Sequence, residues 1–281
     1  MRFLAIETSS LTGSLALFED VRCVGEERFP EGMVHGREIT PRLQILLSRT
    51  GTQAASIEGL AVSGGPGSYT GCRVGMTAAK SLGFSLRVPV VAVSSLEVLA
   101  SGACTRSGRG KSDALVAPVL DGRRGKYYVA LFRRSSGAQP NRLLEDRIGT
   151  TEQIARWLAE KASSSARVSC CGDGAAAFLA GFSTLAADCE GSSLRVERAA
   201  AENDIPAART LGELAASRLR GARFDLETLH KLQVTYLRPS EPEVRWQRGE
   251  FSGVTSRVSS ALASSQTPAT TKGSAGREGD S

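Results

Sequence analysis

The sequence predicts an α/β protein in which mixed sheets are flanked by helices. Three observations predict this class. Apolar runs alternate with turn signals between residues 3 and 24, as expected for consecutive antiparallel strands. A strand, a glycine-rich turn, a helix and another strand follow as a βαβ unit, which adds a parallel pair to the same sheet. The second half repeats this order of hairpin, helix and strand without repeating the sequence.

The elements of the first half are expected in this order. Residues 35–49 carry apolar side chains at helical spacing. Pro41 either begins this helix, with Thr40 as its N-cap, or lies within a longer helix that starts at His35 and is kinked. The remaining expected elements are a strand at 57–62, a helix from the glycine-rich turn to about 86, a strand at 88–93 and a short helix at 94–99.

The second half begins after a small, polar and basic stretch at 101–113, which indicates a boundary or an exposed loop. Its expected elements are strands at 114–120 and 127–132 joined by a turn at 121–122, a helix at 151–161, a strand at 168–171, and helices at 174–179 and 202–219. We predict one lobe at 1–103 and a second at 104–240, whose late helix at about 202–220 is a candidate to pack back on the first lobe. A disordered tail rich in Ser and Thr is predicted at 241–281.

Composition favours a globular, cytoplasmic protein. The 281 residues are 41% hydrophobic and 23% charged, and no apolar run approaches the roughly 20 residues of a membrane span. The net charge of +6 suits a polyanion, but the cations are spread along the chain. The six cysteines form no CxxC pair, which favours buried free thiols, with the adjacent Cys170 and Cys171 as a redox alternative. With no HxxxH pair, no metal site is predicted.

The glycine-rich stretch GGPGSYTG, residues 64–71, resembles several known loops and matches none of them. A nucleotide P-loop needs a Gly-Lys-Ser/Thr sequence that is missing here. The dinucleotide fingerprint fails by one residue, and Pro66 and Thr70 stand where a hydrolase elbow needs glycines. We therefore expect the glycines to supply unusual backbone angles while Ser68 or Thr70 caps the next helix, with anion binding at its N-terminus as the alternative.

The helix after this loop has an unusually wide apolar and small-residue arc of roughly 200°, against the roughly 100° of an ordinary surface helix. Such a helix is covered on two sides. The remaining stripe holds Arg73, Thr77, Lys80 and Arg87, with Phe84 among them. A single exposed Phe is normal on a surface, and the stripe is equally consistent with a partner-binding face.

Catalytic groups are scarce. Glu7, Asp121 and Asp173 are candidate acids, and each lies where a turn or strand end commonly places one. The hairpin DGRRGKYY, residues 121–128, mixes cations with tyrosines. Arg123, Arg124 and Lys126 are accordingly candidate RNA contacts, while a solvated turn explains the same charges.

Several motifs together resemble one known family, the bacterial TsaB (YeaZ) family. The motifs, in chain order, are FLAIETSSLTGSLAL, HGREITPRLQILL, AVSGGPGSYTGCRVGMTAAKSLGFSLRVPVVAVSSLEVLA, LDGRRGKYYVALF, CGDGA and VTYLRP. The likeness extends from about residue 1 to 239, and the long Gly-Pro-Gly segment is its specific part.

The resemblance implies an actin-like ATPase (ASKHA, ribonuclease H-like) fold of two related lobes. It also implies a role in making N6-threonylcarbamoyladenosine in tRNAs that read codons starting with A. The family member acts as a noncatalytic partner of its paralogue TsaD, together with a TsaE-like ATPase, and reaches tRNA through this complex. It is expected to need no cofactor of its own, with ATP and a metal ion in the partner subunits, and to form a homodimer when alone.

The resemblance also places sites in this sequence. The pairing surface falls on the first helix and on the helix after the Gly-Pro-Gly loop, with the candidate contacts His35, Arg37, Leu43, Leu46, Arg73, Met76, Thr77, Lys80 and Phe84. His35 stands alone where TsaD carries two metal-binding histidines. Met76→Glu is accordingly predicted to disrupt pairing without unfolding the monomer.

A nucleotide loop, vestigial in the partner-subunit interpretation, would comprise Thr8, Ser9, Gly64, Gly65, Gly67 and Ser68. Glu7 replaces the Asp of many actin-like ATPases, and no glycine follows in the ETSS sequence, so ATP hydrolysis is not expected. The alternative function is a stand-alone actin-like small-molecule kinase or ATPase that uses this loop. A metalloprotease is a third possibility, which the missing HxxxH pair disfavours.

Overall fold

The computed structural model describes residues 1–30, 32, 35–106, 114–134, 139–162, 167–188 and 194–237. Residues Met1–Leu237 form one compact unit. The predicted tail at 241–281 lies outside the described residues, as does most of the predicted boundary at 101–113.

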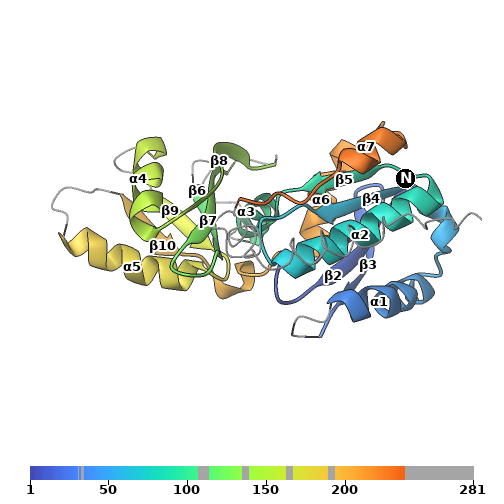
Figure 1. Ribbon diagram of the computed structural model, residues 1–281, viewed down its shortest axis with the longest axis horizontal. Helices are drawn as coiled ribbons and strands as arrows, with labels where there is room; N and C mark the ends of the chain where they lie inside the picture. The colour runs from blue at the N-terminus through green and yellow to red at the C-terminus, as the bar shows by residue number, and fades with distance from the viewer. Residues whose placement is uncertain are drawn as a thin grey trace, which may run out of the picture. The chain divides into compact units, whose positions relative to one another are not determined.

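The first sheet has five strands (Figure 1). Its inner strands are buried because they are nearly continuous apolar runs, whereas the strand at one edge, residues Arg22–Arg28, is polar and largely half-buried. The strands are β1 (Arg2–Glu7), β2 (Ser14–Glu19), β3 (Arg22–Arg28), β4 (Gly59–Ser63) and β5 (Val90–Val93). Their order is β3-β2-β1-β4-β5; β1, β2 and β3 are antiparallel neighbours, while β4 pairs parallel with β1 and with β5. The predicted hairpins and parallel pair are thus confirmed.

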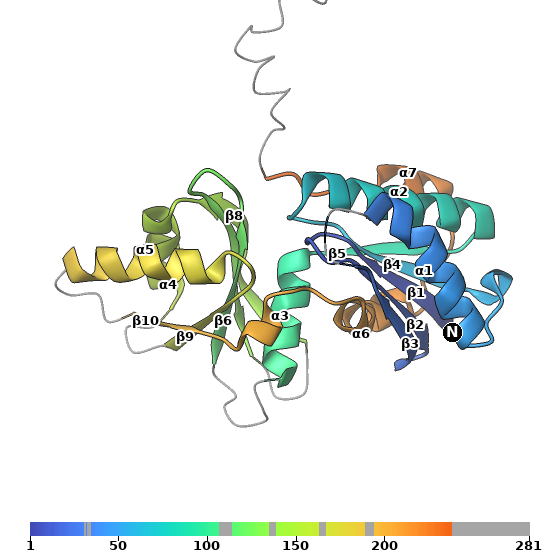
Figure 2. The same cartoon turned by 90° about the horizontal axis from the view of Figure 1, so that it is seen from below.

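Helices cover both faces of this sheet (Figure 2). One face carries α1 (His35–Arg49), α2 (Tyr69–Leu86) and the short α7 (Leu226–Lys231). The opposite face carries α6 (Ala208–Leu219), which contacts β1, β2, β4 and β5. Pro41 lies inside α1, so the longer of the two predicted helices is the correct one.

The second sheet repeats the topology of the first. Its strands are β6 (Leu115–Asp121), β7 (Tyr127–Arg133), β8 (Asn141–Gly149), β9 (Arg167–Cys171) and β10 (Arg195–Arg198). Read from β8, their order is β8-β7-β6-β9-β10, again with two antiparallel pairs followed by two parallel ones. One face packs on α4 (Thr151–Lys161) and α5 (Ala175–Asp188), and the other on α3 (Ser95–Arg106).

Several elements differ from the prediction. Strands β8 and β10 and helix α7 were not predicted, and α3 extends beyond 99. The helix predicted at 202–219 is divided into a 3-10 turn, η2 (Ala201–Asn203), and α6, because Pro206 has no N–H to continue a helix. A second 3-10 turn, η1 (Ala54–Ser56), precedes β4.

Candidate functional site

The glycine-rich loop between β4 and α2 is packed against the chain that follows β1. The backbone N–H of Ser68 donates to the carbonyl oxygen of Ser9 at 2.7 Å, and the Thr8 hydroxyl donates to the Gly71 carbonyl at 2.8 Å. Ser68 is the N-cap of α2, as predicted, because its hydroxyl accepts from the Gly71 N–H. The Gly71 amide in the first turn of the helix is therefore already satisfied.

Glycine residues, which have no Cβ atom, make this close approach possible. A Cβ atom on Gly67 would lie 2.3 Å from the Ser9 carbonyl oxygen, and one on Gly71 would lie 2.1 Å from that of Thr8. Gly65 has φ +86°, in the left-handed region that favours glycine. The six predicted nucleotide-loop residues thus lie together, and several of their polar groups are hydrogen-bonded to other atoms of the chain.

Glu7 ends β1 beneath this loop and is fully buried. Its Oε1 atom accepts from the Ser9 N–H at 2.7 Å and from the Ser9 hydroxyl at 2.6 Å. Its Oε2 atom is buried without a hydrogen-bond partner. Burial raises the pKa of the Glu7 carboxyl above its ordinary value, and the hydrogen bonds from Ser9 only partly oppose this.

His35 begins α1 and is buried next to the same segment. Its Nε2 atom lies 2.7 Å from the Ser10 carbonyl oxygen, so Nε2 carries the proton that is donated. Its Nδ1 atom is buried without a partner. Among the residues that the structure describes, no group of three or more His, Cys, Asp or Glu side chains is placed to hold a metal ion.

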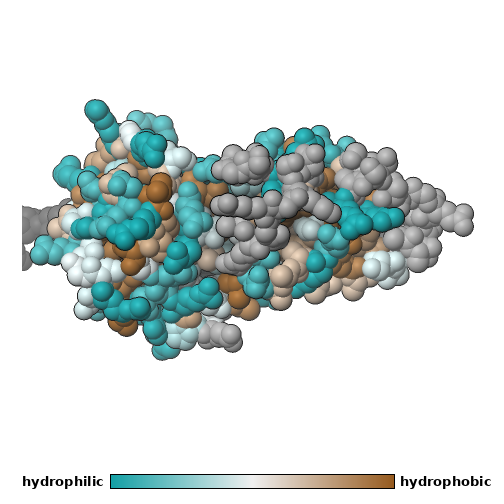
Figure 3. Space-filling model, turned by 180° about the vertical axis from the view of Figure 1, so that it is seen from behind, coloured by the Kyte–Doolittle hydropathy of each residue, from teal (hydrophilic) through white to brown (hydrophobic). Residues whose placement is uncertain are grey.

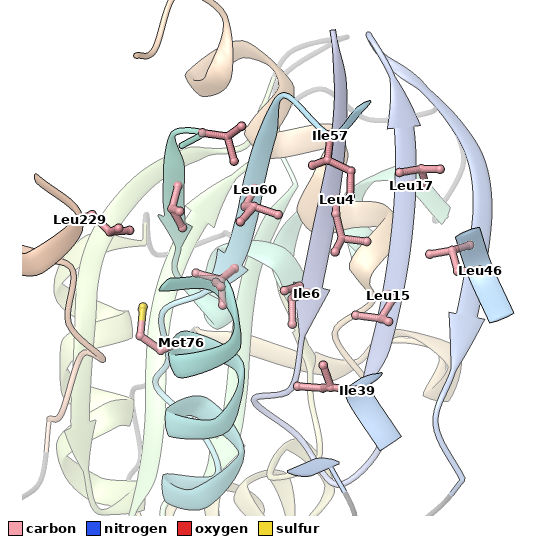
Figure 4. Packing of buried hydrophobic residues seen from close by; sticks show 14 of the residues in the cluster. Leu4, Ile6, Leu15, Leu17, Ile39, Leu46, Ile57, Leu60, Met76 and Leu229 are labelled. Atoms are coloured by element: carbon pink, nitrogen blue, oxygen red, sulfur yellow. The ribbon is translucent and has the colours of Figure 1, made fainter. Parts of the chain in front are cut away.

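The predicted partner contacts divide into a buried and an exposed set. His35 (2% exposed), Leu46 (1%) and Met76 (5%) belong to the interior, and Figure 4 shows Met76 and Leu46 within the cluster that also contains Leu229 of α7. This corrects the prediction for these three side chains, which support the helices from beneath. Met76 is buried because α7, far away in the sequence, covers the second side of α2, whereas His35 and Leu46 lie on α1, which packs on β2 and β3.

Lys80 is also used within the chain. Its ammonium group donates to the carbonyl oxygens of His230 and Leu232, each at 3.1 Å, and so ties the end of α7 and the residue after it to α2. The exposed predicted contacts are Arg37 on α1 and Arg73, Thr77 and Phe84 on α2, while Leu43 is half-buried.

The exposed side of α2 is continuous. Thr70, Arg73, Thr77, Ser81 and Phe84 follow at intervals of three or four residues, so they share one face of the helix. Phe84 is 60% exposed. At the other end, the Arg73 guanidinium lies 4.8 Å from the centre of the Tyr69 ring, which packs on Tyr236 at 5.3 Å.

Figure 3 shows the molecule from behind, where the coloured residues form hydrophobic groups separated by hydrophilic ones. A cavity of about 440 Å³ lies between the β1–β2 turn at Thr12–Ser14, Arg28 and the segment Ala201–Ala207. Of the predicted site residues, none lines it.

The candidate groups of the second sheet lie at the tip of the β6–β7 hairpin. Arg123, Arg124 and Lys126 are exposed there, and Asp121 and Asp173 are joined because Asp173 Oδ1 accepts the Asp121 N–H at 2.9 Å. Burial raises the pKa of the Asp173 carboxyl, and the nearby Asp121 charge acts in the same direction.

The buried cysteines do not have the character of reactive thiols. Burial raises the pKa of Cys72 and of Cys170 to about 12, and raises that of Cys171 as well. The five described cysteines are free. The redox alternative for Cys170 and Cys171 is therefore disfavoured, and Cys189 lies outside the described residues.

The duplicated topology defines the class of the protein. Two five-stranded sheets of identical strand order, each flanked by helices on both faces, form the actin-like ATPase (ASKHA) fold that the sequence predicts. The sequence model of the TsaD family, described as tRNA N6-adenosine threonylcarbamoyltransferase, matches residues 33–244. This is well over half of the chain, which therefore belongs to the TsaD family. Among the described residues, no helix has the length and apolar character needed to cross a membrane.

Curated relatives agree with the resemblance found in the sequence. The chain is similar to the tRNA threonylcarbamoyladenosine biosynthesis protein TsaB of Bacillus subtilis, with 37% identity over 137 residues, 49% of this chain and 57% of that protein. It is similar to TsaB of Escherichia coli with 35% identity over 135 residues, 48% of this chain and 56% of that protein. The matches thus span little more than half the length of these relatives.

A solved structure shows the same fold. YeaZ from Pseudomonas aeruginosa superposes with a TM-score of 0.66 at 21% identity, covering 84% of this chain and 99% of that one. The predicted resemblance to the TsaB (YeaZ) family is confirmed.

Proposed function

We propose that this chain takes part in the biosynthesis of N6-threonylcarbamoyladenosine in tRNA, as a noncatalytic subunit that dimerises with a TsaD-like transferase. The relatives named TsaB support the pathway. The observation that carries the noncatalytic role is the packing of the Gly64–Ser68 loop on Thr8 and Ser9. The Thr8 hydroxyl, the Ser9 N–H and the Ser68 N–H already donate to other atoms of the chain, which supports this role because these donors are then not available to the phosphates of a nucleotide.

The exposed faces of α1 and α2 supply the proposed docking surface. We define this surface by Arg37, Arg73, Thr77 and Phe84, which are exposed while the apolar side chains beneath them are buried. A large exposed ring beside cations and small residues is typical of an interface anchor. The other proposed partners are a TsaE-like ATPase and, through the assembly, tRNA; a homodimer is proposed for the chain alone. ATP and a metal ion are proposed for the partner subunits.

The proposal is tested with the full chain and its TsaD counterpart from the same cell. Association is measured by calorimetry and by light scattering after gel filtration, for the wild type and for Phe84→Glu. A carboxylate buried without a partner at an interface is costly, so Phe84→Glu should abolish the complex. Ser183→Glu, on the exposed side of α5, is the matched control and should bind like the wild type.

A cellular measurement completes the test. Depletion of the protein should lower the amount of N6-threonylcarbamoyladenosine in total tRNA, and re-expression of the Ser183→Glu variant should restore it. If the wild type forms no complex and depletion leaves the modified nucleoside unchanged, the proposal is wrong. Tight magnesium–ATP binding by the isolated chain would instead favour the kinase alternative.

A further inference from the structure

The tip of the β6–β7 hairpin has an unusual backbone for its sequence. Arg123, Arg124 and Gly125 have φ of +64°, +56° and +69°, all in the left-handed region. Glycine and asparagine tolerate this region, whereas a long L side chain enters it at a cost. Two successive arginines are therefore unfavourable residues for this turn. Their presence indicates that the tip has a role besides forming the turn.

A set of hydrogen bonds holds the tip in this conformation. Asp121 Oδ1 accepts the Arg123 N–H at 2.8 Å, and Asp121 Oδ2 pairs with the Arg123 guanidinium at 3.1 Å. Asp173 in turn accepts the Asp121 N–H, and the Gly122 N–H donates to the Lys126 carbonyl at 2.9 Å. The cations are therefore presented from a fixed support.

Positive charge gathers at this edge of the second sheet. Arg123, Arg124 and Lys126 are all exposed, and Asp121 pairs with Arg123. The N-terminus of α5 begins two residues after Asp173, and a Cβ on Gly174 would lie 2.8 Å from the Asp121 nitrogen. The positive end of the helix dipole adds to the same field.

The topologically equivalent turn of the first sheet has no such charges. The turn between β1 and β2, residues 8–13, contains no cation, and its backbone is packed against the loop before α2. The duplicated fold thus has one sealed turn and one exposed cationic turn. The charges at the second turn are accordingly not a requirement of the shared fold.

We propose that the Arg123–Lys126 tip binds phosphate groups of the tRNA backbone. This inference rests on the proposed function, because that function brings tRNA to the assembly. Guanidinium and ammonium groups on a rigid tip contact phosphates without reading bases, so the tip positions the tRNA and does not select its sequence.

The test replaces the two arginines by residues that suit the backbone better. Arg123→Asn/Arg124→Gly keeps the turn and removes two charges. Arg156→Gln/Arg195→Gln, two exposed arginines on α4 and β10, is the control with the same charge loss. Binding of an unmodified tRNA that reads a codon starting with A is measured by filter binding over a range of KCl concentrations, for the full chain alone and in complex with its TsaD counterpart.

Each lost phosphate contact should lower the slope of log affinity against log salt by about 0.7 to 0.9. For two contacts this corresponds to an affinity about 25- to 60-fold lower near 0.1 M salt. The tip variant should show this loss with an unchanged or higher melting temperature and unchanged association with TsaD, while the control keeps wild-type slope and affinity.

Four results would overturn the inference: a tip variant with wild-type affinity and slope, an equal loss in the control, a fall in melting temperature that accompanies the loss, or competition by magnesium–ATP that shows a nucleotide to be the ligand. If the wild-type chain forms no complex with TsaD, that result counts against the proposed function and not against the inference about the tip. The tip is then tested by the binding of tRNA to the free chain.

Discussion

The two sides of α2 should respond differently to truncation. Met76 is 5% exposed and packs in the core cluster with α7, whereas Phe84 is 60% exposed on the same helix. Met76→Ala removes a buried side chain, which in protein cores costs about 2 to 5 kcal/mol of unfolding free energy. Phe84→Ala removes a side chain that is mostly in water already, so we expect a change within about 0.5 kcal/mol.

The affinity for TsaD should respond in the opposite way: the Phe84 variant should lose more affinity than the Met76 variant. Phe84 is the largest exposed side chain of the docking surface, and a central aromatic anchor contributes about 2 kcal/mol or more, equivalent to roughly 30-fold in Kd. Met76→Ala lies beneath that surface and should bind TsaD with near wild-type affinity under conditions where it is folded.

The assay combines urea unfolding followed by circular dichroism with calorimetric titration of TsaD. For a protein of this size, each kcal/mol lost corresponds to a melting temperature lower by about 2 to 4 °C. A Met76→Ala variant with a wild-type urea midpoint and lost TsaD binding would refute the assignment of Met76 to the core. Wild-type affinity for Phe84→Ala would remove Phe84 from the docking surface.

Three further changes test the packing around the loop. Burial raises the pKa of Glu7, so its stability contribution is complete below the ordinary carboxyl pKa and is lost as the pH rises through the raised value; Glu7→Gln should abolish this decline in urea midpoint. Gly71→Ala should lower the melting temperature, since its Cβ would lie 2.1 Å from the Thr8 carbonyl oxygen, whereas Gly36→Ala on α1 has open space and should raise it slightly. Lys80→Met should speed amide hydrogen exchange after α7, where the ammonium group binds two carbonyl oxygens.

The sequence predicts those elements whose signals are local. Central strands such as β1 and β6 are apolar runs, and the Ser68 cap follows from the residues beside it. Strands β8 and β10 lie at or near a sheet edge and are half-exposed, so main-chain pairing holds them without a buried apolar run. Helix α7 has six residues, too few to show a helical period.

The sequence predicted which helix belongs to the candidate site, but not which of its side chains face the interior. Helical spacing correctly indicated that α2 is covered on two sides, but it does not identify the covering segment. That segment is α7, about 150 residues later, which buries Met76 and engages Lys80. A tertiary contact at this sequence distance leaves no local pattern, and for that reason two of the predicted surface contacts serve the monomer.

The duplicated topology allows the equivalent turns of the two sheets to be compared. In both sheets a hairpin turn and a strand–helix loop meet at the same edge, because the strand orders are identical. In the first sheet these segments bind each other, with Ser68 donating to Ser9, so the edge contributes packing. In the second sheet the Asp121 N–H donates to Asp173 and the Asp121 carboxylate binds Arg123, so the base of the hairpin is fixed while Arg123, Arg124 and Lys126 stay exposed to solvent. An edge that is closed by its own backbone supports a docking helix, whereas an edge that is anchored only at its base remains available to a phosphate ligand.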